Sequence, residues 1–151
     1  MRVAILGIGT VVMMACSSSG STGDPQNGNA TVVIGGTTGK LVVGSAIADA
    51  STPGNMIVQL GTDGVTCSTD LDSSGGATAG QFAYFSVSAG GPGVYSDVQI
   101  NLASQRGNDV AFDSGTGSVE IDTITTRVTG TLAYAPGGTA ANGTFDVEKC
   151  F

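Results

Sequence analysis

The chain has 151 residues, a formal net charge of −7 and no histidine. Its length suits a single domain, and the missing histidine excludes serine–histidine triads, cysteine–histidine pairs and histidine-based zinc or iron sites. The negative charge argues against nucleic acid and anionic lipid headgroups as partners, because both are themselves negative. The 25 glycines follow no period, so they indicate turns rather than collagen.

The first fifteen residues have the pattern of an export signal. Arg2 precedes an uncharged apolar run from Val3 to Met14, which has the length of a signal-peptide core and is too short to span a bilayer. A Gly-x-Gly element in this run suggests a dinucleotide-binding fold, but Val12 occupies the position of the required third glycine. We therefore predict a signal peptide over residues 1–15.

The signal ends in a pair of residues with a known counterpart. Ala15 and Cys16 resemble the lipobox of bacterial lipoproteins, in which a small residue precedes an obligatory cysteine. The resemblance implies cleavage before Cys16 and attachment of lipid to its sulfur, and two or more acyl chains hold a protein stably at a membrane. A plain secretory signal followed by an unrelated cysteine is the alternative.

Residues 17–30, SSSGSTGDPQNGNA, contain no large aliphatic or aromatic side chain. Such a segment cannot bury apolar surface, so residues 16–30 are predicted to be a lipidated cysteine followed by a flexible tether. In enteric-type lipoproteins an aspartate after the cysteine favours the inner membrane, and here that residue is Ser17. The resemblance therefore implies a lipid anchor at the outer membrane, with the domain facing the periplasm or the cell surface.

From Thr31 onward, apolar and polar residues alternate in short stretches separated by Gly, Pro, Asn and Asp. This period of two predicts β-strands with one buried and one solvated face. The clearest alternation assigns to one face Val94, Ser96, Val98, Ile100 and Leu102. We predict one all-β domain over residues 31–151, an antiparallel β-sandwich or barrel of about seven to nine short strands.

Two further cysteines, Cys67 and Cys150, lie 83 positions apart in this predicted domain. Leftover cysteines of an exported chain usually pair, so we predict a disulfide that joins the C-terminal strand to the loop after the Met56–Leu60 strand. The alternative is two free buried thiols, or a reactive one.

The C-terminal segment carries a second resemblance. A final Gly-Thr-Phe-x-Val strand over residues 143–147, followed by Cys150, resembles small β-rich lipoproteins of Gram-negative bacteria. Those proteins have no assigned function, so the resemblance implies no activity.

The stretch Asp70-Leu71-Asp72-Ser73-Ser74-Gly75 resembles the first half of a calcium loop. Alternating oxygen ligands around a glycine turn can surround a hard cation, which makes Asp70, Asp72 and Ser74 weak calcium candidates, with Asp63 as an extra ligand. Gln81 stands where a bidentate glutamate would complete the loop. A polar turn beside Cys67 is the alternative.

Two pairs of carboxylates are spaced for one strand face, Glu120 with Asp122 and Asp146 with Glu148. Paired carboxylates can hydrolyse glycosides, although pairs on an outer strand face are usually solvated surface.

These observations give three functional hypotheses. The first is a non-enzymatic, membrane-anchored extracytoplasmic module without cofactor or catalytic residue, which supports the envelope or binds a protein or glycan partner. The alternatives are a hydrolase that uses carboxylates and a calcium-dependent binding module.

Overall fold

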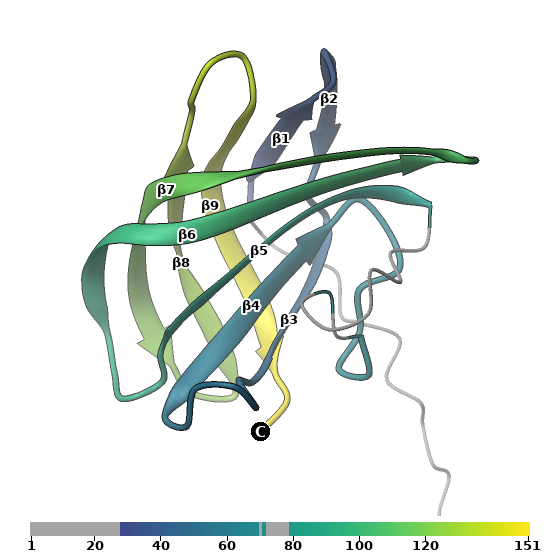
Figure 1. Cartoon of the computed structure of the whole chain (residues 1–151). Coiled ribbons are helices and arrows are strands. Elements are labelled where there is room, and N and C mark those ends of the chain that lie inside the picture. The colour runs from purple at the N-terminus through teal and green to yellow at the C-terminus, as the bar shows by residue number, and fades with distance from the viewer. Residues whose placement is uncertain (1–27, 70, 72–78) are drawn as a thin grey trace, which may run out of the picture.

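The computed structural model describes residues 28–69, 71 and 79–151. This part of the chain contains nine β-strands (Figure 1). Their bounds are β1 Thr31–Ile34, β2 Thr37–Lys40, β3 Val43–Ala48, β4 Asn55–Gly61, β5 Gly80–Ser88, β6 Gly93–Arg106, β7 Asp109–Ile124, β8 Arg127–Tyr134 and β9 Ala140–Lys149. The all-β prediction is confirmed.

Strands β3 to β9 close into a seven-stranded barrel, so of the two predicted architectures the barrel is correct (Figure 1). Each strand pairs antiparallel with the next along the chain, and β9 then pairs with β3 to close the sheet. This last pairing is parallel, with Ser45 opposite Glu148, so the purely antiparallel prediction is wrong there. The reason is geometric: in an up-and-down barrel with an odd number of strands, the first and the last strand run in the same direction.

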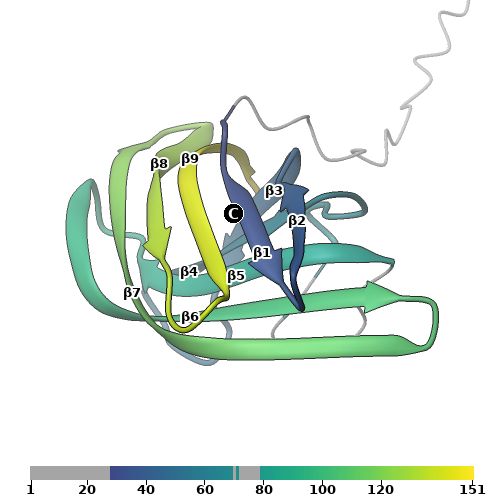
Figure 2. The same cartoon turned by 90° about the horizontal axis from the view of Figure 1, so that it is seen from above.

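The β1–β2 hairpin lies outside this closed ring. β1 pairs with the first residues of β9, and β2 pairs with β1. The hairpin therefore lies beside β9 at one end of the barrel, and in Figure 2 its tip points toward the paired strands β6 and β7.

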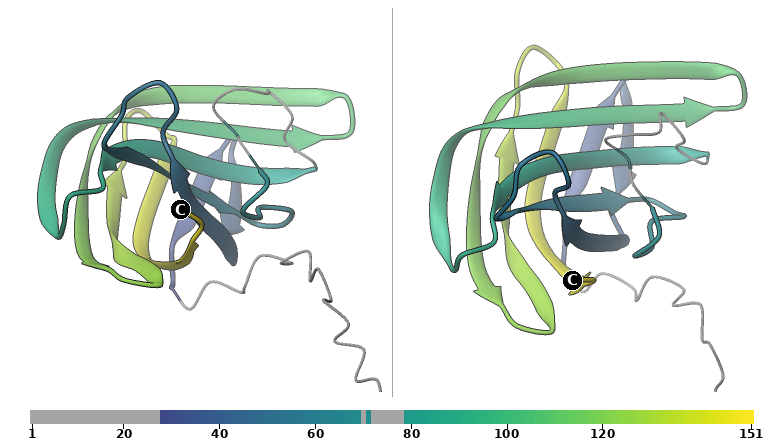
Figure 3. Two further views of the ribbon diagram at one scale, coloured as in Figure 1. Left: turned by 90° about the horizontal axis from the view of Figure 1, so that it is seen from below. Right: turned by 60° about the horizontal axis from the view of Figure 1, so that its bottom comes forward.

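Strands β6 and β7 have 14 and 16 residues, so the prediction of short strands fails for this pair. They form one long hairpin that ends in the Gly107–Asn108 turn and reaches past the other strands (Figure 3). Two-residue hairpin loops favour glycine at the first position in a type II′ turn, and Gly107 has the positive φ, 61°, that this turn requires.

A β-bulge in β6 reverses the predicted faces of its first residues. The register with β7 shifts between Tyr95 and Val98, and Asp97 adopts a φ of 57°. One extra residue moves all preceding side chains to the opposite face. Val94, predicted to be buried, is therefore 71% exposed, whereas Tyr95 packs against the core and its hydroxyl donates to the carbonyl of Gly91 at 3.2 Å.

Aromatic and aliphatic side chains fill the barrel interior, and some of them pack directly against glycines in the strands. Phe85 and Phe145 meet edge to face, with ring centroids 5.8 Å apart. Gly130 on β8 leaves room for the second ring, because a Cβ there would lie 2.8 Å from Phe145 Cζ and 2.0 Å from the carbonyl oxygen of Glu120. The prediction that glycines mark turns is thus incomplete, since some make space inside the barrel.

The change Gly130→Ala is expected to destabilise the domain by about 2–3 kcal/mol, because the new methyl group must displace both a backbone carbonyl and a core ring. Urea unfolding measures this loss. Gly93→Ala is the matched control, since its new Cβ would lie 3.5 Å from the nearest atom, the hydroxyl of Tyr95. Equal losses in the two variants would contradict the packing role of Gly130.

The end of the predicted tether belongs to the barrel. The Asn29 amide donates to the Thr144 carbonyl at 2.9 Å, and Ala30 is fully buried in the core. The packed domain therefore includes residues that we assigned to the tether. Cys16 and the predicted signal peptide lie outside the described residues.

Candidate functional site

A groove of about 650 Å³ opens at the end of the barrel where the β6–β7 hairpin projects. One wall is the β1–β2 hairpin, and the other comprises the first residues of β5 and the tip of the β6–β7 hairpin. Its lining includes Ile34, Thr38, Ser104, Arg106, Asp109 and Ala111. The mouths of β-barrels are common places for binding sites, so we take this groove as the candidate site.

Gln81 fixes the first wall. Its side-chain amide donates to the Thr37 carbonyl at 3.0 Å, and its backbone amide donates to the Thr62 hydroxyl at 3.0 Å. The side chain lies directly over Gly39, where any Cβ would meet the Gln81 amide oxygen. These contacts tie β2 and Thr62 to the start of β5 along this side of the groove.

The groove combines apolar and polar chemistry. Ile34 and Ala111 contribute apolar surface, and hydroxyl-bearing residues surround them. Arg106 and Asp109 face each other across the last pair of the β6–β7 ladder, so the charges at this end of the groove balance. Asp109 is the one carboxylate among the described lining residues. This lining suits a ligand held by hydrogen bonds and apolar contact.

Tyr134 on β8 lies in the barrel core, with its side chain almost fully buried. Among the described residues no hydrogen bond of ordinary geometry reaches its hydroxyl, although the Thr139 and Asp113 side chains lie close to it. Burial raises the pKa of this hydroxyl above its ordinary 10.0, and the nearby Asp113 carboxylate raises it further. The phenol therefore stays protonated and cannot serve as an anionic nucleophile at neutral pH.

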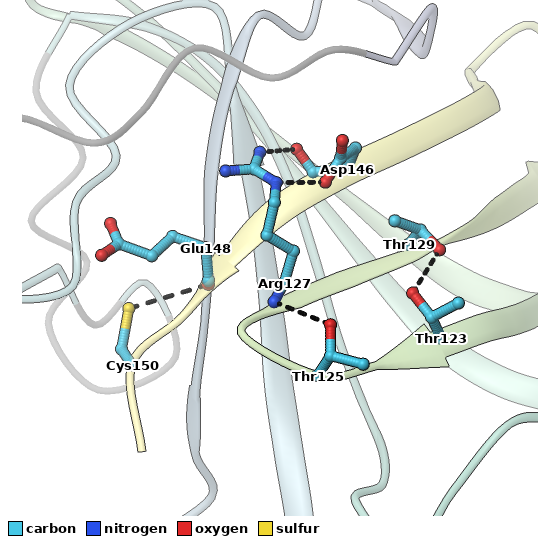
Figure 4. A network of polar contacts seen from close by, with 7 residues as sticks. All are labelled: Thr123, Thr125, Arg127, Thr129, Asp146, Glu148 and Cys150. Carbon is cyan, nitrogen blue, oxygen red and sulfur yellow. Dashed lines mark hydrogen bonds and ion pairs between the residues drawn. The ribbon is translucent and has the colours of Figure 1, made fainter.

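The predicted carboxylate pairs do not converge on this groove. Glu120 and Asp122 are exposed on β7 beside a second register shift. Asp146 accepts a hydrogen bond from Arg127, with 2.5 Å between the Asp146 carboxylate and Arg127 Nε (Figure 4). Glu148 lies on the same strand, and its carboxylate is close to the sulfur atoms of the disulfide. Asp146 is thus engaged in an ion pair, and the Glu148 carboxylate lies beside the disulfide rather than at the groove.

The predicted disulfide is present and joins Cys67 to Cys150, with Cα atoms 5.5 Å apart. It links the loop after β4 to the end of the chain, as the sequence predicted. The carboxylate of Glu148 and the two sulfurs all lie within 4.8 Å of one another. Because both sulfurs are consumed in the bond, they offer no thiolate to a metal.

Most of the weak calcium candidates fall outside the part of the chain that the structure describes. Asp70, Asp72 and Ser74 lie outside the described residues. Asp63 is exposed, and its carboxylate accepts the neighbouring backbone amide of Gly64 at 2.8 Å. The calcium loop therefore stays a prediction.

Sequence reasoning missed a buried amide that fastens this same loop. Gln59 on β4 is fully buried, and its side-chain nitrogen donates to the Thr69 carbonyl at 2.7 Å and to the Ser45 hydroxyl at 3.2 Å. Its side-chain oxygen accepts from the Leu71 amide at 2.6 Å. The sequence did hold a sign of this buried amide, because Gln59 is the one polar residue in the apolar run from Met56 to Leu60.

Asp49 organises the opposite end of the barrel. One carboxylate oxygen accepts the amides of Ser51 and Thr52 at 2.8 and 3.0 Å, and the other accepts the Ser86 hydroxyl at 2.6 Å. The bond from Ser86 is the main reason why the pKa of Asp49 lies below its ordinary 3.8, and the two amides add to it against the opposing effect of burial. The charged form thus stabilises the β3–β4 turn.

Asp49 is expected to make stability depend on pH at acid values. Because its folded pKa is lowered, its stabilising effect is complete above the unfolded value near 3.8 and disappears as the pH falls through the lower folded value. Urea unfolding of the parent and of Asp49→Asn should differ most near pH 7 and converge only once the pH has fallen below the lowered folded pKa. Glu120→Gln, at an exposed position on β7, is the control. A difference that stays constant with pH would contradict this role.

Comparison with known protein families, with curated proteins and with solved structures gave no significant match. Within the described ranges, no helix is long and apolar enough to cross a membrane.

Proposed function

We propose that this chain is a lipid-anchored extracytoplasmic binding module without enzymatic activity, which receives its partner at the barrel mouth. The observation that carries the proposal is the Cys67–Cys150 disulfide, combined with the lipobox-like Cys16. Stable disulfides of this kind belong to oxidising compartments, to which an N-terminal export signal would deliver the chain. The proposed localisation at the outer membrane rests on the resemblance of the first sixteen residues to bacterial lipoproteins.

The direction of β1 indicates on which side of the barrel the N-terminal tether would leave, relative to the groove. β1 runs from Thr31 to Ile34, and Ile34 lines the groove. The chain before Thr31 therefore leads away from the groove. Residues 17–28 can extend by about 40 Å. A lipid on Cys16 would thus leave the barrel free to turn its mouth away from the bilayer.

The alternative hydrolase is less well supported. A glycosidase needs two carboxylates on either side of one bond, at most about 9.5 Å apart. Asp109 is the one described carboxylate in the groove, and Asp146 is paired with Arg127. The polar lining and balanced charges of the mouth favour binding over hydrolysis.

Metabolic labelling with an alkyne-bearing fatty acid tests the anchor. The parent chain is expected to incorporate the label and to fractionate with the outer membrane, whereas Cys16→Ser should lose the label completely. Cys67→Ser with Cys150→Ser is the matched control, because it removes the other two cysteines and should keep the label. Intact-mass analysis should find a mature chain that begins at acylated Cys16. An unlabelled parent chain that retains residues 1–15 would overturn the proposal.

A further inference from the structure

One edge of β7 has no neighbouring strand over half its length. β7 pairs with β6 from Asp109 to Ile121, but its pairing with β8 begins only at Ser118. Among the described residues, no strand therefore pairs with the other edge of β7 between Asp109 and Gly117. This stretch lies in the part of the hairpin that projects past the barrel (Figure 2).

The turn geometry shows which backbone groups this edge presents. In a hairpin with a two-residue loop, the residues that flank the loop exchange both backbone hydrogen bonds, and here they are Arg106 and Asp109. Residues of β7 then alternate, so the N–H and C=O groups of Val110 and Phe112 point away from β6. At the next such position, Ser114, the amide is already satisfied by the Asp113 carboxylate at 2.9 Å. The edge thus presents two consecutive sets of donors and acceptors.

The side chains around these groups are apolar on one face and polar on the other. Val110 is 50% exposed and Phe112 is 69% exposed, both on the outer face. Ala111 faces the groove, and it lies between Asp109 and Asp113 on that inner side. Exposed edge strands with apolar side chains are templates for pairing with another chain. If a partner strand paired with this edge, every second side chain of that strand would contact Phe112 on the outer face. The side chains between them would lie on the inner side, at the groove.

We propose that the β7 edge binds an extended segment of a partner protein by β-strand addition, with basic residues of that segment on the inner side of the edge, opposite Asp109 in the groove and Asp113 further along β7. This inference names the partner class of the binding site proposed above and rests on that proposal. The occupant is basic because the net charge of −7 leaves an excess of negative charge even with Arg106 set against Asp109. Asp113 adds a second carboxylate on the inner side of the edge, where it accepts the Thr139 hydroxyl. A second copy of the chain fits poorly, since full antiparallel overlap from Asp109 to Gly117 sets Asp113 against Asp113.

A short peptide tests the proposal directly. The probe is acetyl-Thr-Lys-Val-Thr-Val-Lys-Thr-amide, whose valines would face Val110 and Phe112 and whose lysines would face Asp109 and Asp113. Hydrogen exchange is measured on the full-length chain with Cys16→Ser. The amides of Val110 and Phe112 are expected to exchange about tenfold more slowly at a peptide concentration ten times the Kd. Two matched peptides, one with glutamate in place of lysine and one with both valines N-methylated, should give no protection.

A variant of the protein tests the same contact from the other side. Val110→Pro removes an amide that points away from β6, so the hairpin is expected to persist while the peptide binds about tenfold more weakly or not at all. Val110→Thr keeps the amide and should bind within about twofold of the parent. Circular dichroism and urea unfolding confirm that both variants fold, and the N-methylated peptide gives the same test without altering the protein.

Three results would overturn the strand-addition proposal. They are unchanged exchange at Val110 and Phe112 with the lysine peptide, equal binding of the N-methylated peptide, and a dimer of the parent that Val110→Pro dissociates. Each leaves the anchor intact if the Cys16 labelling succeeds. Conversely, a chain that binds the peptide but is never acylated would refute the anchor and leave the β7 edge as a binding site.

Discussion

Loss of the Cys67–Cys150 bond is expected to destabilise the domain by about 4 kcal/mol and to lower its Tm by roughly 15 °C. The size follows from the loop that the bond closes, because its ends are 83 residues apart and the unfolded chain loses much conformational freedom when they are joined. In the folded state the bond fixes the loop after β4 to Cys150, which follows β9 near the C-terminus. Urea unfolding of the parent and of the double variant Cys67→Ala, Cys150→Ala measures the difference.

Reduction of the parent is the matched control for this variant. The reduced parent should unfold at the same urea concentration as the double variant, and reductant should leave the double variant unchanged. A loss below about 1 kcal/mol would show that contacts within the loop, rather than the disulfide, hold it in place.

The sequence contained enough information for the fold class and the disulfide. Alternation through Val98, Ile100 and Leu102 reports one buried strand face, and all three side chains are buried in the barrel. The pairing of Cys67 with Cys150 followed from elimination among three cysteines, once Cys16 was assigned to the lipid. The first inference depends on a local alternation of residues and the second on the number of cysteines. Neither requires knowledge of the order of the strands in the sheet.

The features that sequence reasoning missed depend on long-range geometry. Val94 continues the alternation of its strand, but a bulge at Asp97 turns it outward, and no local pattern marks a bulge when the extra residue is an aspartate. The free edge of β7 exists because β8 is shorter than β7, which alternation within one strand cannot reveal. The groove likewise depends on how far the β6–β7 hairpin overshoots its neighbours.

The burial of β4 on both faces also depends on residues that lie elsewhere in the chain. The outer face of a barrel strand is normally solvated, yet Ile57 and Gln59 on that face are buried. Val65 and Leu71 from the following loop pack with Phe82 in a second apolar cluster. Here the loop acts as an additional layer, and a polar loop sequence gave no indication of it.

Replacement of Gln59 by leucine is expected to destabilise the domain by about 2–4 kcal/mol, although the two side chains have similar volume. The cost arises because the Thr69 carbonyl and the Leu71 amide lose their partner while they remain shielded from water. Gln99→Leu on the exposed face of β6 is the matched control and should change stability by less than about 0.5 kcal/mol. Urea unfolding of both variants checks the difference.

Gln59 and the disulfide hold the same loop against β4, so their effects should not add. Once Gln59→Leu has removed the hydrogen bonds to Thr69 and Leu71, the disulfide holds a loop that is fastened less firmly to the barrel, and breaking it should cost less than in the parent. A double-mutant cycle with Cys67→Ala, Cys150→Ala should therefore give a coupling free energy of about 1 kcal/mol or more. Strict additivity would mean that the buried amide stabilises β4 alone, and that the disulfide by itself fixes the loop to the barrel.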